Sequence, residues 1–517
     1  MLSLRENFDI EFLSINQLSY VFNKFCESTN SSQYTSFCIH IASKCLHLMN
    51  RYGALHPSHE KLIDYLKKHG QQNIYDRQWC STIQQRSCEF QETLNTKFDT
   101  ILASSNASSS PSDNQQLFSE VRQGVVIAII ETNYQNALSF LNKYSTVVQF
   151  YTQPRSLAQL KENRFIEYLF FQYIVSIFDL IWFPLDSLQQ QQFTFTRRDD
   201  STSGGFKNLD SIAKKVNNYY TKCEMLLSSS VPEEEEIEHI SDELFYFWLV
   251  KFYGLTVLFK QFKFLEFHEE FDVLFVKYQT INAQIEASPL LLLSDNLPIL
   301  RSNILSMYGI VMIFLKPFNS LSLMDVGNDD ALLDLFSAEE DKFEYLLYHE
   351  VMVPLSESNN RKAKMNFLEN SRFSDMFVAC LDYLAPAVPK SSTSASINFI
   401  RYLNLIIDFK NFLLILSVVK QAPRLKMIEL LGYDIRTMSD SSLSATTHNI
   451  LSLMGALGLG KIGVGYRSHQ DVFFNEGHDS KLAVRELQSR MDELTNDLQA
   501  ESIAITMTGA LLEKFFS

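Results

Sequence analysis

Residues 461–474, KIGVGYRSHQDVFF, contain the clearest β-hairpin pattern in this chain. Apolar side chains alternate with other residues on both sides of a polar turn at 467–470. The alternating positions are Ile462, Val464, Tyr466, Val472 and Phe474. A period of two places side chains on alternate faces of a strand, and two such runs around a polar turn are typical of a hairpin. The segment therefore predicts two short strands.

Helical patterns flank this predicted hairpin. One helix is expected over 397–420 and another over 446–458, and short helices followed by a single hairpin outline a winged helix. Beyond the hairpin, residues 480–500 form a charged helical pattern with one narrow apolar seam, as in a coiled coil. The members of this seam are Leu487, Met491, Leu494 and Leu498.

The sequence before residue 366 is also helical in pattern. Apolar residues recur mostly at three- and four-residue steps in 159–182, and 299–316 and 329–353 look similar. Residues 242–286 predict two aromatic-rich helices that meet near Gln261. Antiparallel helix pairs following one another over about 350 residues favour an α-solenoid, a conclusion that rests on architecture because no fixed-period consensus is visible.

Polar stretches of low complexity or high charge interrupt these helices. They include 103–116 (ASSNASSSPSDNQQ), 197–208 and 228–236, and each is predicted to be a loop. Because such stretches lack apolar residues to hold them in place, limited proteolysis is expected to cut first at 103–116 and 197–208.

The predicted fold class is all-α with a small winged-helix β element. Residues 1–365 are expected to form a helical-repeat solenoid, 366–475 a helical domain with a winged helix, and 480–517 a C-terminal tail helix. The 16 glycines and 12 prolines among 517 residues favour this class, because folds built on many tight turns need more of both.

Composition narrows the classes of function. A net charge of −15 without a run of Lys and Arg disfavours a nucleic-acid partner. Seven dispersed cysteines are typical of reduced thiols in the cytoplasm or nucleus. The first residues carry acidic side chains and no apolar core, so no secretory signal is predicted. Charged residues interrupt the most hydrophobic stretches, so no membrane span is expected and the protein is predicted to be soluble.

One glycine-rich segment resembles a phosphate-binding loop. Gly455–Lys461 has the spacing of the two outer glycines and the lysine, but Ile462 stands where Ser or Thr must supply a hydroxyl to magnesium. A phosphate loop also follows a strand and opens a helix, whereas this segment follows a helix and opens a hairpin. We interpret it as a flexible helix-to-strand turn.

Residues of the types that bind zinc occur together at Cys38, His40, Cys45 and His47. On a helix the cysteines share one face, and two residues displace the histidines from it by about 200°. We interpret them as buried thiols and polar-face imidazoles. The His-Glu pairs at 268 and 349 lack the second His of a zinc protease, and no serine-hydrolase elbow is present. The sequence therefore predicts no catalytic, cofactor-binding or metal-binding residue.

The order of elements from about 366 to 475 resembles the PCI domain, a module shared by subunits of the COP9 signalosome, the proteasome lid and translation initiation factor three. The likeness is greatest to a COP9 signalosome subunit and covers about a quarter of the chain. It comprises a helix ending in a basic residue, an Arg-Leu helix, a polar loop, a helix, a Gly-Lys-Ile turn, a hairpin and a charged tail helix. The matching positions are Lys420, Arg424–Leu425, Ser439–Ser444, Asn449–Leu457, Gly460–Ile462, Ile462–Phe474 and Lys481–Ala500.

This resemblance implies a non-catalytic scaffold subunit in the cytoplasm and nucleus. In that family, winged-helix strand edges pair between subunits and the last helices join a shared bundle, so the hairpin and seam residues would be interaction residues. The COP9 signalosome, which regulates ubiquitin ligases by cullin deneddylation, is the first expectation, and the proteasome lid is the second. The other classes are a helical transcription regulator that binds DNA and an enzyme with an unrecognised helical active site.

Overall fold

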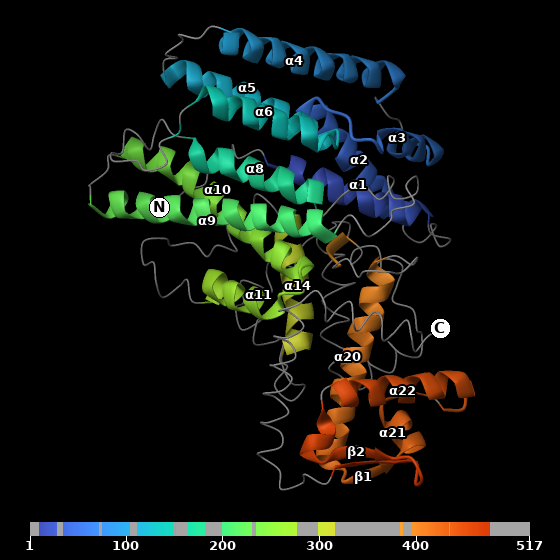
Figure 1. The fold of residues 1–517 in the computed structure, drawn as a ribbon. Helices are drawn as coiled ribbons and strands as arrows, with labels where there is room; N and C mark the ends of the chain where they lie inside the picture. The colour runs from blue at the N-terminus through green and yellow to red at the C-terminus, as the bar shows by residue number, and fades with distance from the viewer. Residues whose placement is uncertain are drawn as a thin grey trace. The chain divides into compact units, whose positions relative to one another are not determined.

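The computed structural model is predominantly helical, with one small three-stranded antiparallel sheet, as the sequence predicts (Figure 1). The residues that it describes are 10–27, 35–71, 75–103, 111–148, 150, 164–180, 199–229, 234–276, 298–315, 383–385, 395–433, 435–456 and 458–475. The predicted domain boundary at 365/366, the predicted helix at 329–353 and the tail at 480–517 lie outside these residues.

The chain divides into two compact units. The first unit comprises Met1–Val257 and Tyr278–Leu300, and the second comprises Leu258–Lys277 and Arg301–Ser517. Among the described helices, none is both long enough and apolar enough to cross a membrane.

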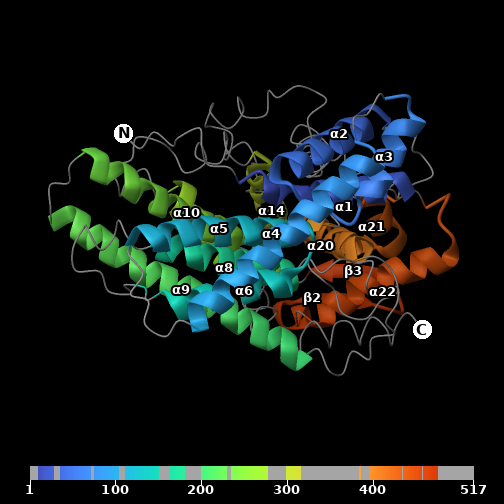
Figure 2. The ribbon, with the colours of Figure 1, turned by 90° about the horizontal axis from the view of Figure 1, so that it is seen from above.

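The first unit is built from helices in which sequence neighbours pack against one another. These helices are α1 (Phe12–Glu27), α2 (Thr35–Tyr52), α3 (His59–Lys68), α4 (Arg77–Ala103), α5 (Pro111–Ile130), α6 (Tyr134–Val147), α8 (Phe165–Leu180), α9 (Asp199–Ser229) and most of α10 (Glu234–Lys260). Figure 1 shows α4, α5, α6, α8 and α9 as successive rows, and Figure 2 shows them from above. The described part of this unit contains no strand.

The first helix also contacts helices far along the chain. The Phe12 ring stacks beside Phe171 of α8, with ring centroids 6.4 Å apart. The Asn16 amide donates to the Tyr134 hydroxyl of α6 over 3.4 Å. In a solenoid each repeat contacts only its neighbours. The contacts of α1 therefore make this unit more compact than a simple nearest-neighbour array.

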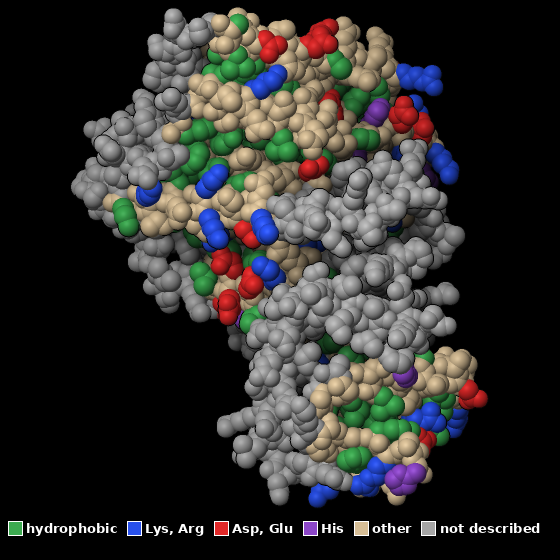
Figure 3. Space-filling view, in the orientation of Figure 1, with side chains coloured by type: hydrophobic (Ala, Val, Ile, Leu, Met, Phe, Trp, Pro, Cys, Tyr) green, Lys and Arg blue, Asp and Glu red, His purple; other side chains and the backbone are tan. Residues whose placement is uncertain are grey.

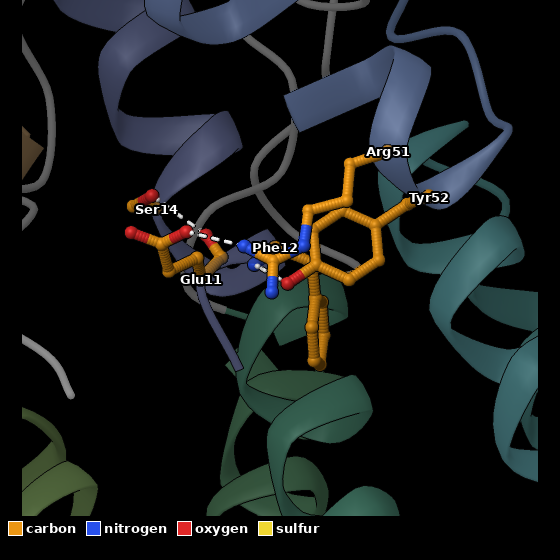
Figure 4. Close-up of polar contacts among 5 residues, drawn as sticks. All are labelled: Glu11, Phe12, Ser14, Arg51 and Tyr52. Atoms are coloured by element: carbon orange, nitrogen blue, oxygen red, sulfur yellow. Dashed lines mark hydrogen bonds and ion pairs between the residues drawn. The ribbon is translucent and has the colours of Figure 1, made fainter. Parts of the chain in front are cut away.

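A group of polar contacts joins the start of α1 to the end of α2 (Figure 4). The Phe12 amide donates to the Tyr52 hydroxyl over 3.2 Å, and the two rings meet edge to face. Arg51 pairs with Glu11 at 3.0 Å, and both side chains are more than 40% exposed. An ion pair so open to water adds little stability, so the Phe12–Tyr52 contact is the main connection here.

A buried carboxylate joins α8 to α10 and α5. Glu167 is 3% exposed and accepts a hydrogen bond of 2.8 Å from the Tyr246 hydroxyl. Its oxygens also lie 3.6 Å from Arg122 and 3.8 Å from Arg164. A charge removed from water requires such partners. Burial, together with the neighbouring carboxylate, raises the pKa of Tyr246 well above its usual value, so this phenol stays protonated and donates.

Tyr246→Phe is expected to destabilise the protein by about 1–3 kcal/mol, because the buried Glu167 carboxylate would lose a hydrogen-bond donor. Urea denaturation of the single variants and of the Tyr246→Phe, Glu167→Met double variant measures the coupling between the two side chains, because Met removes the acceptor. An equal cost of Tyr246→Phe in the Glu167→Met background would contradict a role for this hydrogen bond.

Parts of the three predicted loops are helical. Residues 111–116 form the start of α5, and 199–208 form the start of α9. Similarly, α9 includes residues 228 and 229, and α10 begins at Glu234. Proline suits the first turn of a helix, and acidic residues there interact favourably with the helix dipole, so these polar stretches can begin helices. The expectation that they are loops throughout was wrong.

The second unit contains the last residues of α10, then α11 (Phe264–Phe271), the π-helical turn η3 (Asp272–Val276) and most of α14 (Pro298–Leu315). The predicted break near Gln261 is confirmed, because a turn with Phe262 at φ 60° separates α10 from α11. The predicted helices at 159–182 and 299–316 correspond to α8 and α14. Lys260 donates to the carbonyls of Tyr383 and Ala385 at 2.6 and 2.7 Å.

The described residues between 395 and 475 in the second unit form the C-terminal module. Its elements in order are α20 (Ala395–Val418), β1 (Gln421–Pro423), α21 (Arg424–Leu430), α22 (Asp440–Ala456), the 3-10 turn η7 (Leu459–Ile462), β2 (Val464–Arg467) and β3 (Val472–Asn475). The strand order is β1-β3-β2, and both pairings are antiparallel. The sequence predicted the hairpin as an isolated pair of strands; this was wrong, because β1 adds a third strand.

Candidate interaction site in the C-terminal module

The two faces of the sheet are fixed by its register. Tyr466 and Ala422 both lie opposite Phe473, and Gly465 lies opposite Phe474. Because side chains alternate along a strand, Phe473, Val464 and Tyr466 share one face, and Phe474, Val472 and Arg467 share the other. The five predicted hairpin residues therefore do not form one surface.

The inner face belongs to the module's own hydrophobic core. Phe473 is fully buried and meets Phe412 of α20 edge to face, with ring centroids 5.1 Å apart. Val464 is 3% exposed, and Tyr466 packs at the margin of the same core. Helices α20, α21 and α22 supply most of the remaining core residues: Phe409, Phe412, Leu416, Met427, Ile450 and Met454. Val464 and Tyr466, two of the expected interaction residues, therefore pack in or against this core.

The outer face carries an aromatic ring stacked beneath a cation. The Phe474 ring crosses Gly465, where an added Cβ would lie 2.5 Å from the ring. The Arg467 guanidinium lies over the same ring, 4.5 Å from its centroid, which is a cation–π arrangement. Only glycine at 465 allows Phe474 to lie this close to β2. Phe474 and Val472 remain partly exposed.

The turn between β2 and β3 is held by one carboxylate. Asp471, at φ 54°, accepts from the Tyr466 hydroxyl and pairs with the Arg424 guanidinium at 2.9 Å. The Arg424 amide also donates to the Asp471 carbonyl over 2.8 Å. The bond from Tyr466, with the nearby Arg424, lowers the pKa of Asp471 and keeps it ionised. The start of α21 is thereby joined to the hairpin turn.

The two edges of the sheet differ in the groups that they present. The backbone N–H of Asn475 donates to the Lys420 carbonyl over 2.9 Å, so the N–H and C=O groups of Asn475 point toward β1. Because the direction of these groups alternates along antiparallel strands, the N–H and C=O groups of Val464 and Tyr466 in β2 point away from β3. On the opposite edge Pro423 has no N–H to offer. The edge of β2, unpaired among the described residues, is therefore the better template for another strand.

The remaining predicted interaction residues are Ile462 and the four seam residues. Ile462 belongs to η7 and not to a strand, because Gly458 and Gly463 both adopt positive φ and enclose a 3-10 turn. The glycine-rich segment is thus a helix-to-strand turn, as interpreted from the sequence. The seam residues Leu487, Met491, Leu494 and Leu498 lie outside the described residues.

The cysteines and histidines of α2 separate as their spacing predicts. Cys38 and Cys45 are buried, whereas His40 and His47 are exposed. Across the part of the chain that the structure describes, no three His, Cys, Asp or Glu side chains converge as a metal site.

Sequence reasoning missed the residues that complete the sheet. β1 is three residues long, contains proline and has no alternating pattern, so only its pairing with β3 identifies it. Phe473 was overlooked because an alternating apolar pattern can include either Phe473 or Phe474, and the sequence analysis chose Phe474.

Comparisons with known proteins do not assign this chain to a family. No protein-family model matches the chain, and no curated protein matches it significantly.

Gly465→Ala is expected to destabilise the C-terminal module by about 1–3 kcal/mol, because its methyl group would overlap the Phe474 ring. Gly455→Ala on α22 is the matched control: its added Cβ meets nothing within 4 Å, and alanine favours a helix by about 0.5–1 kcal/mol. Thermal unfolding of both variants measures the difference. A Gly465→Ala variant as stable as Gly455→Ala would contradict the close approach of Phe474.

Proposed function

We propose that this chain is a non-catalytic scaffold subunit of a PCI-type complex, and that its C-terminal module is a winged helix that pairs through the outer edge of β2. The observation that carries the proposal is the sheet order β1-β3-β2 on three helices, with β2 at an edge. A strand that presents two N–H and two C=O groups gains hydrogen bonds by joining a neighbouring sheet.

The COP9 signalosome is the first candidate complex, and its third subunit is the nearest likeness in the order of elements. The chain would then contribute to cullin deneddylation by holding other subunits in place, in the cytoplasm and nucleus. The proteasome lid is the second candidate. Residues 1–365 would serve as the helical-repeat region that precedes the module in such subunits, and the tail at 480–517 would join the bundle.

Charge distribution gives a second candidate, a regulator that binds DNA through the winged helix. The C-terminal module has eight Lys and Arg against five Asp and Glu, although the chain as a whole is acidic. Figure 3 shows Lys and Arg side chains along the lower rim of this module. DNA-binding winged helices need positive charge where they meet phosphates.

The arrangement of these charges favours a protein partner. Helix α22, which follows the Arg-Leu helix α21, contains no Lys or Arg, and its first turn carries Asp440. On α21, Lys426 pairs with Glu429 at 2.8 Å and Arg424 pairs with Asp471. Exposed apolar side chains lie on either side of β1 in sequence: Val418 is 74% exposed and Leu425 is 45% exposed. Such groups suit contact with protein.

Purification of the chain from its native cell, followed by identification of stoichiometric partners, tests the proposal directly. Several PCI-domain proteins in fixed ratio are expected. Binding to duplex DNA that weakens steeply with salt, without such partners, would instead favour the regulator.

Tyr466→Pro compared with Tyr466→Ala tests the edge of β2. Both variants lose the tyrosine side chain, but only proline removes the outward N–H, a change that an edge strand tolerates within its own sheet. Tyr466→Pro is expected to co-purify with far less partner than Tyr466→Ala, at a similar melting temperature. Equal recovery of partners with the two variants would rule out pairing through this N–H.

Polar replacement of the seam residues Leu487, Met491, Leu494 and Leu498 tests the tail. It is expected to leave the melting temperature of the isolated chain largely unchanged, because so narrow a seam suits a helical bundle better than a private core. The fraction that co-elutes with partners should fall severely, since each buried leucine contributes about 2 kcal/mol or more. A collapse of the melting temperature would instead identify the tail as an intramolecular element.

A further inference from the structure

Two cysteines meet at the end of the α1–α2 hairpin where α1 ends and α2 begins. Cys26 is exposed in the last turn of α1, and Cys38, 2% exposed, lies in the first turns of α2. The residues that precede them, Phe25 and Phe37, have their rings in edge-to-face contact with centroids 5.6 Å apart. This contact brings the two helices together at the level of the thiols.

The thiols also interact with each other. A hydrogen bond with Cys26, assisted by one with the Tyr65 hydroxyl, lowers the pKa of Cys38 despite the opposing effect of burial. Phe22 packs against the Tyr65 ring, with centroids 5.2 Å apart, so Tyr65 of α3 is held at this position. The result is one thiol open to solvent beside a second thiol whose pKa is lowered.

Another cysteine of α2 shows the ordinary behaviour of a buried thiol. Cys45 is fully buried, and burial raises its pKa to about 12. The Ser19 hydroxyl donates to its sulfur over 3.9 Å. Cys45 is therefore inert, although it lies two helical turns from Cys38.

We propose that Cys26 and Cys38 form a reversible disulfide site that responds to hydrogen peroxide. Peroxide oxidises the exposed Cys26 thiol to a sulfenic acid and is reduced to water. The Cys38 thiol then loses its proton and attacks the Cys26 sulfur. An S–S bond forms, the S–O bond breaks, and the hydroxyl leaves with that proton as a second water. Two thiols and one peroxide thus give one disulfide and two waters, and a dithiol reverses the change.

The disulfide would fasten the end of the hairpin opposite to the Phe12–Tyr52 contact (Figure 4). It closes a short span, residues 26–38, and such a cross-link stabilises chiefly by restricting the unfolded chain. Oxidation would therefore make the α1–α2 hairpin more resistant to opening. This inference does not depend on the proposed function.

Treatment of the full chain with hydrogen peroxide, followed by non-reducing peptide mapping, tests the site. A Cys26–Cys38 cross-linked peptide is expected, with Cys45 unmodified. The melting temperature should rise by about 5 °C and return to its first value with dithiothreitol. Cys26→Ser and Cys38→Ser should abolish both changes, and Cys88→Ser, at an exposed cysteine of α4, should leave them intact.

Oxidation of Cys26 to the sulfinic acid without a cross-link would overturn the proposal, as would a disulfide that joins either residue to a different cysteine. A cross-link that forms without any change in melting temperature would keep the site but overturn its effect on the hairpin.

Discussion

Alternation along β3 is the constraint on which the candidate interaction site depends. Phe473 fills the core beneath the sheet, so its neighbours Val472 and Phe474 must point to the other side. The same alternation directs the N–H and C=O groups on the outer edge of β2 away from the sheet, and it places the Phe474 ring across Gly465. A shift of one residue would turn Phe473 outward and bring Val472 and Phe474 to the inner face. Burial of Phe473 against Phe412 therefore selects the register and, with it, the surface that the module can offer.

The helices could be predicted well because their apolar periodicity extends over many residues. The break near Gln261 and the positions of α8 and α14 follow from it. The starts of α5 and α9 could not be predicted, because Ser, Asn and Asp are frequent both in loops and at the start of helices. Only tertiary contacts decide between the two: Val121 of α5 and Val216 of α9 are fully buried, and their packing extends helix into polar sequence.

The site was predicted less completely for a related reason. A hairpin of two four-residue strands carries too few residues to define its register, and two consecutive phenylalanines satisfy either choice. β1 could not be recognised at all, since its ladder with β3 and the bond from Asn475 to Lys420 join segments about fifty residues apart. Glycine density was informative at one point: positive φ at Gly458 and Gly463 ends the helical region before β2.

The difference between the two sheet edges limits how the module can assemble. Pro423 removes a donor from the edge of β1, and the Arg424–Asp471 contacts attach the helix after it to the hairpin turn. The edge of β2 carries no proline and retains two outward N–H groups. If subunits join by strand pairing, this module can extend a sheet readily on one side only. A neighbour on the other side would have to use side chains, and Val418 and Leu425, on either side of β1 in sequence, are exposed apolar groups of that kind. The module would then bind one neighbour through backbone hydrogen bonds and the other through burial of apolar side chains. Because the two contacts differ in chemistry, they would give a hetero-oligomer a defined order of subunits.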